Sequence, residues 1–341
     1  MGHPGRVAAT GEGADDFDTP VETLTRVVGA DGHGERVDRL LALWVPALSR
    51  AYFQTLIESG GVRLNGAVLA KPARKVKVGE QLVVELRPTA QAQAFAPEAL
   101  ALDVVHEDAD LMVLNKPAGL VVHPGAGHWS GTLLNGLLAH HTGAAALPRA
   151  GIVHRLDKDT SGLMVVAKSA VAYDALVRQI AERSVSRVYV ALAHGVWRGP
   201  SELDVERAVG RDPQNRLRMA ALAPGAPGAK PAKTTLRLLS GASEAGGCCW
   251  VGCKLHTGRT HQIRVHMASL GHPLVGDATY GGRPLAGLAR QGLHAHRLAL
   301  AHPVSGRPLG FECPWPADMV KALETLGLDY NTAALWPLAS G

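Results

Sequence analysis

The segment His154–Asp159 is the most chemically dense stretch of the chain and reads His-Arg-Leu-Asp-Lys-Asp. Two apolar runs, Gly151–Val153 and Leu163–Ala167, flank it, and short runs of this kind predict buried strands. Ser161-Gly162 is a turn signal between them. We therefore expect a rigid sheet to hold one loop that carries the reactive side chains, as in many active sites. The alternative is a charged hairpin on the surface.

Two familiar motif classes fit the chain poorly. The order Asp157-Lys158-Asp159-Thr160 after an apolar run is similar to phosphatases that use an Asp nucleophile with a second Asp two residues on. Those sites also need later carboxylates to bind magnesium, and Asp277 stands alone as the best such candidate. The glycines of Gly125–Gly131 are spaced one residue too widely for the dinucleotide fingerprint. Neither function is favoured.

A second polar segment, Leu255–Met267, carries Gln262, Arg264 and His266 in alternation with three apolar residues. The period of two predicts a strand with one basic face and one apolar face. Such a basic face could lie opposite Asp157. The alternative is a strand face exposed to solvent.

The length of 341 residues suggests about two domains. Changes in composition predict five parts, in this order: a flexible tail 1–33 that could pair a short strand at 23–28, a small module 34–88, a linker 89–98, a larger domain 99–330 and a tail 331–341.

The small module combines two predicted helices with a hairpin. The first helix is Arg36–Trp44, Ser49 is a plausible N-cap for the second, and Asn65-Gly66 is a strong hairpin signal. Lys71, Arg74, Lys75 and Lys77 fall together after the hairpin. A basic cluster of this kind is what a phosphate-contacting module needs, although a solvated charged face would look the same.

The larger domain mixes helices and strands without βαβ alternation. Helices are predicted at 132–140, 170–183 and 318–326, and strands at 102–105, 111–114, 187–194, 250–255, 262–265 and 295–300. We therefore predict an α+β fold with a mixed, largely antiparallel central sheet and flanking helices and loops. The Pro/Gly-rich stretch 221–232 is expected to be a flexible inserted loop.

The composition indicates the cellular compartment and the kind of partner that the protein could bind. The net charge is +5 and the pI about 9.1, which is compatible with a polyanionic partner. Four cysteines, without paired C-x-x-C spacing, predict no zinc site and a reducing, cytoplasmic compartment. No apolar run reaches the roughly 18 residues that a membrane span needs, and no signal peptide is expected.

Four stretches of the small module have a familiar sequence: Arg36–Leu41, Ser49-Arg50, Leu56–Gly66 and Lys75–Glu80. Together they resemble the S4 RNA-binding domain, which recurs in RNA-modifying enzymes. The resemblance implies that Arg50, like Lys71, Arg74 and Lys75, contacts RNA.

The larger domain has its own set of characteristic stretches: Asn115–Pro124, Gly151–Lys168, Arg187–Leu192, Thr257–Met267, Gly271–Asp277, Leu293–Ala295 and His302-Pro303. Together they resemble the pseudouridine synthases of the large-ribosomal-subunit type, over about residues 35–325. Three further stretches most resemble the D-type members, which modify uridines in helix 69 of 23S rRNA: His123–Gly127, Gly131–Asn135, and Met219 with Lys230–Thr234.

The resemblance implies an isomerase without cofactor or metal that acts on 23S rRNA or a precursor of the large subunit, as a monomer. It implies these roles: Asp157 as the catalytic carboxylate, Arg264 as its cation, Tyr189 stacking on the target base, Arg155 filling the vacated place in the RNA, His154 as a further substrate-binding residue, and Leu163 and Ile263 as pocket walls that exclude water. Asp157 could attack the base, attack C1′ or remove a sugar proton. Tyr189 could instead be a core aromatic residue.

Two other functions stay open from the sequence. The chain could be an S4-type RNA-binding protein on an inactive scaffold, although the joint presence of Asp157, Arg264 and Tyr189 argues against this. It could also be a pseudouridine synthase that acts on other rRNA or tRNA sites.

Overall fold

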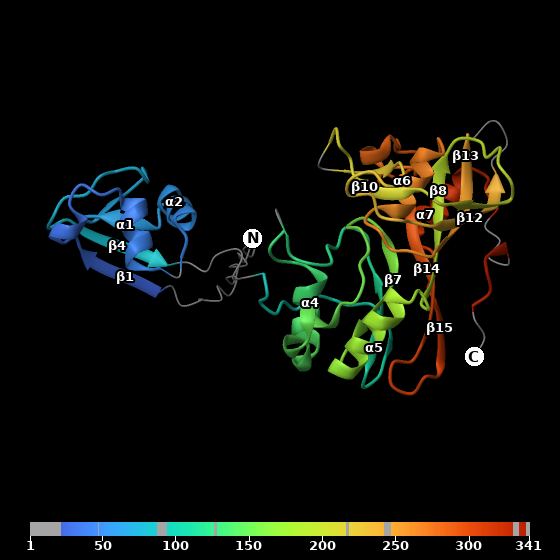
Figure 1. Cartoon of the computed structure of the whole chain (residues 1–341), viewed down its shortest axis with the longest axis horizontal. Helices are drawn as coiled ribbons and strands as arrows, with labels where there is room; N and C mark the ends of the chain where they lie inside the picture. The colour runs from blue at the N-terminus through green and yellow to red at the C-terminus, as the bar shows by residue number, and fades with distance from the viewer. Residues whose placement is uncertain are drawn as a thin grey trace, which may run out of the picture. The chain divides into compact units, whose positions relative to one another are not determined.

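The structure is a computed structural model that describes residues 22–46, 48–86, 94–125, 128–215, 218–241, 247–329 and 334–338. The chain forms two compact units, Met1–Gln93 and Ala94–Gly341 (Figure 1). Among the described helices, none is both long enough and apolar enough to cross a membrane.

The first unit is a four-stranded sheet, in the order β1-β4-β2-β3, with two helices. Its elements are β1 (Glu22–Val27), η1 (Ala30–Gly32), α1 (Val37–Trp44), α2 (Arg50–Glu58), β2 (Val62–Leu64), β3 (Ala67–Val68) and β4 (Gln81–Leu86). Ser49 caps α2 by accepting a hydrogen bond from the Tyr52 N–H at 3.2 Å. The predicted helices and hairpin are confirmed.

The short strand predicted at 23–28 within the tail 1–33 is present as β1 (Glu22–Val27), so the last part of that stretch is folded. β1 pairs antiparallel with β4, and Val28 lies in the core of the unit with 1% of its surface exposed. This pairing joins residues more than fifty positions apart, so the sequence indicated the strand but not its partner. Residues 1–21 of that predicted tail, 87–88 of the predicted module and 89–93 of the predicted linker lie outside the described residues.

The second unit is built on a nine-stranded sheet in the order β5-β6-β7-β14-β8-β13-β12-β9, with β15 beside β14. The strands are β5 (Val104–Glu107), β6 (Leu111–Lys116), β7 (Ser161–Ala167), β8 (Ser186–His194), β9 (Glu202–Val205), β12 (Thr234–Gly241), β13 (Cys248–Leu255), β14 (Leu293–Ala301) and β15 (Pro308–Glu312). Only β7 and β14 pair in parallel among these strands. The α+β fold with a mixed, largely antiparallel sheet is confirmed.

Helices and a small hairpin complete this unit. They are α4 (Leu133–His140), η2 (Thr142–Ala146), η3 (Pro148–Gly151), α5 (Ala170–Ala181), the hairpin β10 (Ala208–Arg211) and β11 (Met219–Leu222), α6 (Gln262–Ser269), η4 (Ala278–Tyr280) and α7 (Ala317–Thr325). α5 lies beside β7 (Figure 1). The part of the predicted flexible insertion at 221–222 belongs to β11, and Lys230 pairs with Val209, so the hairpin reaches into the Pro/Gly-rich stretch.

The predicted strand at 262–265 is wrong, because these residues begin α6. Every residue from Gln262 to Met267 is buried, polar and apolar alike. Alternation indicates a strand only when one face is solvated, so the pattern was uninformative here. The polar side chains find partners inside the protein: Gln262, for example, accepts a hydrogen bond from the Thr257 hydroxyl at 2.7 Å.

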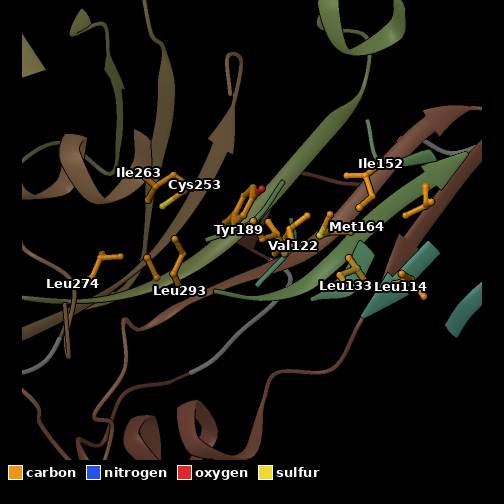
Figure 2. Packing of buried hydrophobic residues seen from close by; sticks show 14 of the residues in the cluster. Leu114, Val122, Leu133, Ile152, Met164, Tyr189, Cys253, Ile263, Leu274 and Leu293 are labelled. Atoms are coloured by element: carbon orange, nitrogen blue, oxygen red, sulfur yellow. The ribbon is translucent and has the colours of Figure 1, made fainter. Parts of the chain in front are cut away.

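Buried apolar residues anchor both ends of the segment that carries Asp157. Ile152 and Leu156 belong to the main core with Met164, Tyr189 and Ile263. Figure 2 shows Tyr189 in the middle of this core, with its ring between residues of the two sides of the cluster. The reactive segment is therefore attached to a rigid interior, as expected.

The flanks of that segment differ in detail from the prediction. Ile152 forms only an isolated bridge with Val166, so Gly151–Val153 is not a strand. Gly162 lies within β7 at φ +112°, where a Cβ atom would collide with the backbone of Ala295 in the neighbouring strand. The glycine therefore marks a close approach of two strands, not a turn.

The structure describes residues 334–338 of the predicted C-terminal tail 331–341, and these residues pack against the second unit. Leu335 is 4% exposed and belongs to a core cluster on the sheet, and the Arg237 guanidinium lies 4.4 Å from the centroid of the Trp336 ring. Such packing needs a partner surface from distant strands, which a scan of composition does not see.

Candidate active site

Asp157 lies on the loop before β7, in the wall of a cavity of about 440 Å³. Its side chain is 17% exposed. The buried Lys116 ammonium donates hydrogen bonds to the carbonyls of Pro117, Leu120 and Lys158, at 2.7, 2.9 and 2.9 Å. Burial lowers the pKa of Lys116 to about 8, against the opposing charges of Asp159 and Asp157. Lys116 thus fixes the backbone of the loop directly after Asp157.

Arg264 of α6 connects Asp157 to a second carboxylate. Its Nη1 donates to Asp157 Oδ2 at 3.1 Å, while its Nε and Nη2 donate to the two oxygens of Asp277 at 2.7 and 2.8 Å. Burial alone would lower the pKa of Arg264, but the hydrogen bonds and charges of Asp277 and Asp157 outweigh burial and raise it. The guanidinium is therefore a permanent cation, oriented by Asp277.

Tyr280 and His261 support the other side of this ion pair. The Arg264 guanidinium carbon lies 5.0 Å from the centroid of the Tyr280 ring, and the Tyr280 hydroxyl is 2.9 Å from His261 Nδ1. His261 Nε2 is 3.9 Å from Asp157 Oδ1. Burial lowers the pKa of His261, so the neutral ring predominates at neutral pH. His261 adopts φ +57°, a left-handed conformation in which it caps α6.

Tyr189 and Ile263 line the cavity next to Asp157, as expected. They are 5% and 3% exposed. Burial raises the pKa of the Tyr189 hydroxyl to about 12, with Arg187 opposing and Asp157 supporting the shift. The phenol therefore stays protonated and offers a flat aromatic face in a dry environment.

His154 and Arg155 also line the cavity, but in different ways. The backbone N–H of Val165 donates to His154 Nε2 at 3.0 Å, which ties the loop to β7. Burial, together with the charge of Arg187, lowers the pKa of His154 to about 3. Arg155 is exposed at the cavity and is free to reach a ligand.

Leu163 does not line the cavity, and its predicted role as a pocket wall is wrong. Residues along a strand alternate between the two faces of a sheet. Leu163 and Val165 pack on the face covered by α5, whereas Met164 and Val166 point to the core beside Asp157.

The basic residues that were predicted to contact RNA belong to the first unit, whereas the cavity belongs to the second. Arg50 Nε donates to the buried Asp38 at 3.0 Å, and Arg74 pairs with Glu80 at 3.4 Å. Lys71 and Lys75 are exposed. Arg50 therefore stabilises the contact between α1 and α2, while its side chain remains about half exposed.

The sequence did not identify four residues of this site: His261 and Arg187, which line the cavity, and Asp277 and Tyr280, which contact Arg264. Asp277 was considered only as a metal ligand, and the left-handed turn at His261 has no sequence signal. Arg187 could have been found, because it lies two residues before Tyr189 on β8 and therefore shares its face.

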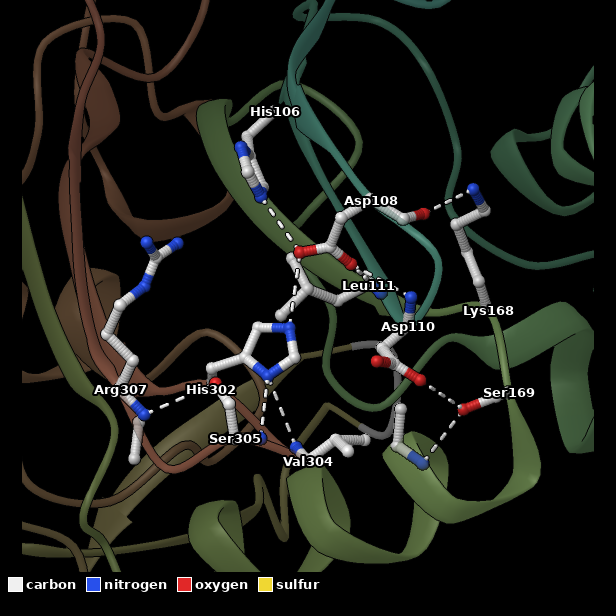
Figure 3. A network of polar contacts seen from close by, with 12 residues as sticks. His106, Asp108, Asp110, Leu111, Lys168, Ser169, His302, Val304, Ser305 and Arg307 are labelled. Carbon is white, nitrogen blue, oxygen red and sulfur yellow. Dashed lines mark hydrogen bonds and ion pairs between the residues drawn. The ribbon is translucent and has the colours of Figure 1, made fainter.

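A separate polar cluster could offer metal ligands, namely Asp108, Asp110 and His302 (Figure 3). However, the oxygens of Asp108 already accept hydrogen bonds from the backbone N–H groups of Asp110 and Leu111 and contact the rings of His106 and His302. These contacts tie the β5–β6 turn to the turn after β14. The cluster therefore stabilises the contact between these two turns, and none of its residues lines the Asp157 cavity.

Comparison with known proteins is consistent over both units. Residues 110–269 match the family described as RNA pseudouridylate synthase, and residues 35–82 match the S4 domain family. The chain is 46% identical over 328 residues to ribosomal large subunit pseudouridine synthase D of Neisseria meningitidis serogroup B, covering 92% of this chain and 85% of that protein.

Other relatives give the same result. The enzyme of the same name from Escherichia coli K12 is 42% identical over 321 residues, which cover 90% of this chain and 95% of that protein. Among solved structures, human RNA pseudouridylate synthase domain containing 1 matches with a TM-score of 0.52 and 31% identity, covering 64% of this chain and 85% of that chain.

Proposed function

Since the chain belongs to the RNA pseudouridylate synthase family and is thus an isomerase, we propose that it converts uridines of the large-subunit ribosomal RNA into pseudouridine, and that its target is the helix 69 stem-loop of 23S rRNA. The relatives named for the large ribosomal subunit support the RNA, and the resemblance of His123–Gly127 and Gly131–Asn135 to D-type members supports the stem-loop.

The observation that carries the proposal is the pair formed by Asp157 and Arg264 beside the Tyr189 ring in one cavity. The reaction breaks the N1–C1′ bond, joins C5 to C1′, moves a proton from C5 to solvent and returns one to N1. Atoms and electrons balance within the substrate. A positioned carboxylate can start this reaction in any of three ways: by attack on the base, by attack on C1′ or by removal of a sugar proton.

Each residue then has a defined task. Arg264 orients the Asp157 carboxylate through the hydrogen bond that its Nη1 donates to Oδ2. Tyr189 stacks on the uracil after the nucleotide leaves its stack, at a cost of a few kcal/mol. Ile263 excludes water that would otherwise capture a reactive sugar. Arg155, exposed at the rim, fills the place that the base leaves in the RNA.

The first unit supplies RNA affinity in this proposal. Lys71 and Lys75 are exposed, and Arg50 and Arg74 keep part of their side chains in solvent. Their positive charges would contact phosphates and release counterions. The enzyme acts as a monomer in the cytoplasm, on 23S rRNA or a precursor of the large subunit.

The test is a map of pseudouridines in the RNA of a host strain that lacks the gene. We expect helix 69 to lose pseudouridine, the wild-type gene to restore it and Asp157→Asn to fail. The matched control is Asp174→Asn, which alters an exposed aspartate on α5 and should restore modification.

The outcomes separate the parts of the proposal. Loss of pseudouridine at other rRNA or tRNA sites would contradict the helix 69 target and leave the chemistry intact. An unchanged map would favour an RNA-binding protein on an inactive scaffold. Full activity of Asp157→Asn would contradict the role of this carboxylate.

A further inference from the structure

Buried polar atoms without partners gather in the Asp157 cavity. Among the described residues, five buried side-chain nitrogen or oxygen atoms have no hydrogen-bond partner, and three of them belong to cavity residues: His123 Nε2, His154 Nδ1 and Arg187 Nε. Buried polar atoms in native proteins are almost always paired. A cluster of unpaired ones in a single cavity therefore indicates groups that a ligand is meant to satisfy.

His154 presents a donor to the cavity. Its Nε2 accepts the Val165 N–H, so in the neutral ring the proton is on Nδ1, as assigned from this hydrogen bond. The ring is neutral because burial, helped by the charge of Arg187, lowers its pKa to about 3. The unpaired Nδ1–H can therefore bind an acceptor atom and nothing else.

The burial of Arg187 needs a stronger explanation than that of His154, because Arg187 carries a charge. It is 7% exposed, and the described part of the chain offers it no carboxylate within ion-pair distance. Gly258 makes room for it: a Cβ atom at that position would lie 2.9 Å from Arg187 Nη1. A buried guanidinium without a counter-charge is costly, so its retention needs a function.

The charges around Arg187 favour an anionic ligand. Among its charged lining residues the cavity has one carboxylate, Asp157, and six arginines: Arg149, Arg155, Arg183, Arg187, Arg259 and Arg264. Arg264 already holds Asp157, so the remaining arginines have no carboxylate in the wall. Guanidinium groups bind phosphate through paired hydrogen bonds.

The geometry of β8 places this charge beside the base. Arg187 and Tyr189 are two residues apart on one face, so their Cα atoms are separated by about 6.6 Å. If the uracil stacks on Tyr189, as in the proposed function on which this inference rests, the phosphodiester on one side of the nucleotide can reach Arg187. We propose that Arg187 and His154 form a phosphate subsite that holds a phosphodiester flanking the extruded uridine.

The test combines a protein change with an RNA change. Stem-loops are made with a neutral methylphosphonate in place of the phosphate 5′ or 3′ to the target uridine. For the wild-type enzyme we expect kcat/KM to fall about 10- to 100-fold with one of the two neutral linkages. Arg187→Gln should lose a similar factor on natural RNA and lose little more when that same linkage is neutral. Additive losses would overturn the proposal and would favour a contact from Arg187 to a uracil carbonyl.

Binding and stability distinguish a ligand contact from a structural role. Arg187→Gln should lower the log–log salt slope of RNA affinity by about one, and Arg187→Lys should restore part of it. The Tm should stay equal or rise, because an unpaired buried charge has been removed. A lower Tm with an unchanged salt slope would overturn the subsite. Arg307→Gln, at an exposed arginine of the β14–β15 turn, is the matched control.

The design also separates this inference from the proposed target. If wild-type enzyme leaves the helix 69 stem-loop unmodified, the target is wrong, and the pseudouridine map supplies the RNA for the same comparison. If wild-type enzyme modifies the stem-loop but neither neutral linkage matters, the subsite is wrong and the target stands.

Discussion

Asp277 holds Arg264 by a two-pronged contact in which both carboxylate oxygens accept hydrogen bonds, at 2.7 and 2.8 Å, from Nε and Nη2 of the guanidinium. Nη1, on the other side of the guanidinium, donates to Asp157 at 3.1 Å. The fork is planar and rigid, so the direction in which Arg264 faces Asp157 is set by Asp277. Asp277 is 1% exposed and does not line the cavity, which makes it a positioning residue.

Asp277→Asn should therefore impair catalysis more than RNA binding. The amide offers one acceptor in place of two, so the guanidinium can turn, and a displacement of about 1 Å can cost about 100-fold in kcat. Removing one partner of a buried pair should also lower the free energy of unfolding by about 3 kcal/mol. Single-turnover kinetics, RNA affinity and urea unfolding measure the three effects.

A matched control exists at another arginine fork. Arg237 pairs with Glu202 in a partly exposed contact, and neither residue lines the cavity. Glu202→Gln should leave kcat and stability close to wild type. A normal kcat for Asp277→Asn would show that Arg264 does not depend on this carboxylate.

Stability should fall below neutral pH because of buried histidines. Burial lowers the pKa of both His154 and His294 to about 3, from an ordinary value of 6.5. Between these values the unfolded chain binds more protons than the folded chain, so the stability is fully present above pH 6.5 and is lost as the pH falls. Each histidine contributes a slope that rises toward a limit of about 1.4 kcal/mol per pH unit as the pH falls below 6.5.

Urea unfolding between pH 7 and pH 5 measures this dependence. His294→Gln should reduce the pH dependence of the free energy of unfolding by the contribution of one histidine. If wild type showed no slope in this range, the two rings would not be held neutral in the folded protein.

The lysines of the first unit should control the salt dependence of RNA binding. Lys71 and Lys75 are exposed, so replacing both with Gln should leave the fold intact and lower the log–log salt slope by about two. Arg50→Gln differs, because it removes a contact to the buried Asp38 and should also reduce stability. Fluorescence anisotropy at several salt concentrations, with thermal unfolding, tests both statements. An unchanged slope in the double lysine variant would contradict RNA contact by these residues.

Arg183 occupies a position that favours glycine. It follows α5 with φ +63°, and the Ser184 N–H donates to the Gln179 carbonyl at 3.0 Å, as at helix ends that usually carry glycine. Arg183→Gly should raise the free energy of unfolding by about 0.5–1 kcal/mol, since the strain is relieved. It should also weaken RNA binding, since the side chain lines the cavity.

Arg183→Ala is the matched variant, because it removes the charge and keeps the strained backbone. Both variants should lose the same RNA affinity, and only the glycine variant should gain stability. Wild-type affinity in both would show that Arg183 does not contact RNA.

Local sequence determined much of this protein. Capping at Ser49, the hairpin signal at Asn65-Gly66 and the apolar run Leu163–Ala167 act over a few residues, and the elements they predict are present. The polar segment around Asp157 was recognisable for the same reason: its composition departs from that of its apolar neighbours.

Tertiary structure decided the rest, because the deciding contacts join distant parts of the chain. Arg264 and Asp157 are 107 residues apart, and only the burial of α6 turns an alternating pattern into a helix whose guanidinium faces the loop. The face on which Leu163 lies and the unpaired state of Arg187 likewise depend on which strands and helices pack there. Desolvation and pairing across the sheet set these outcomes, and neither can be read from neighbouring residues alone.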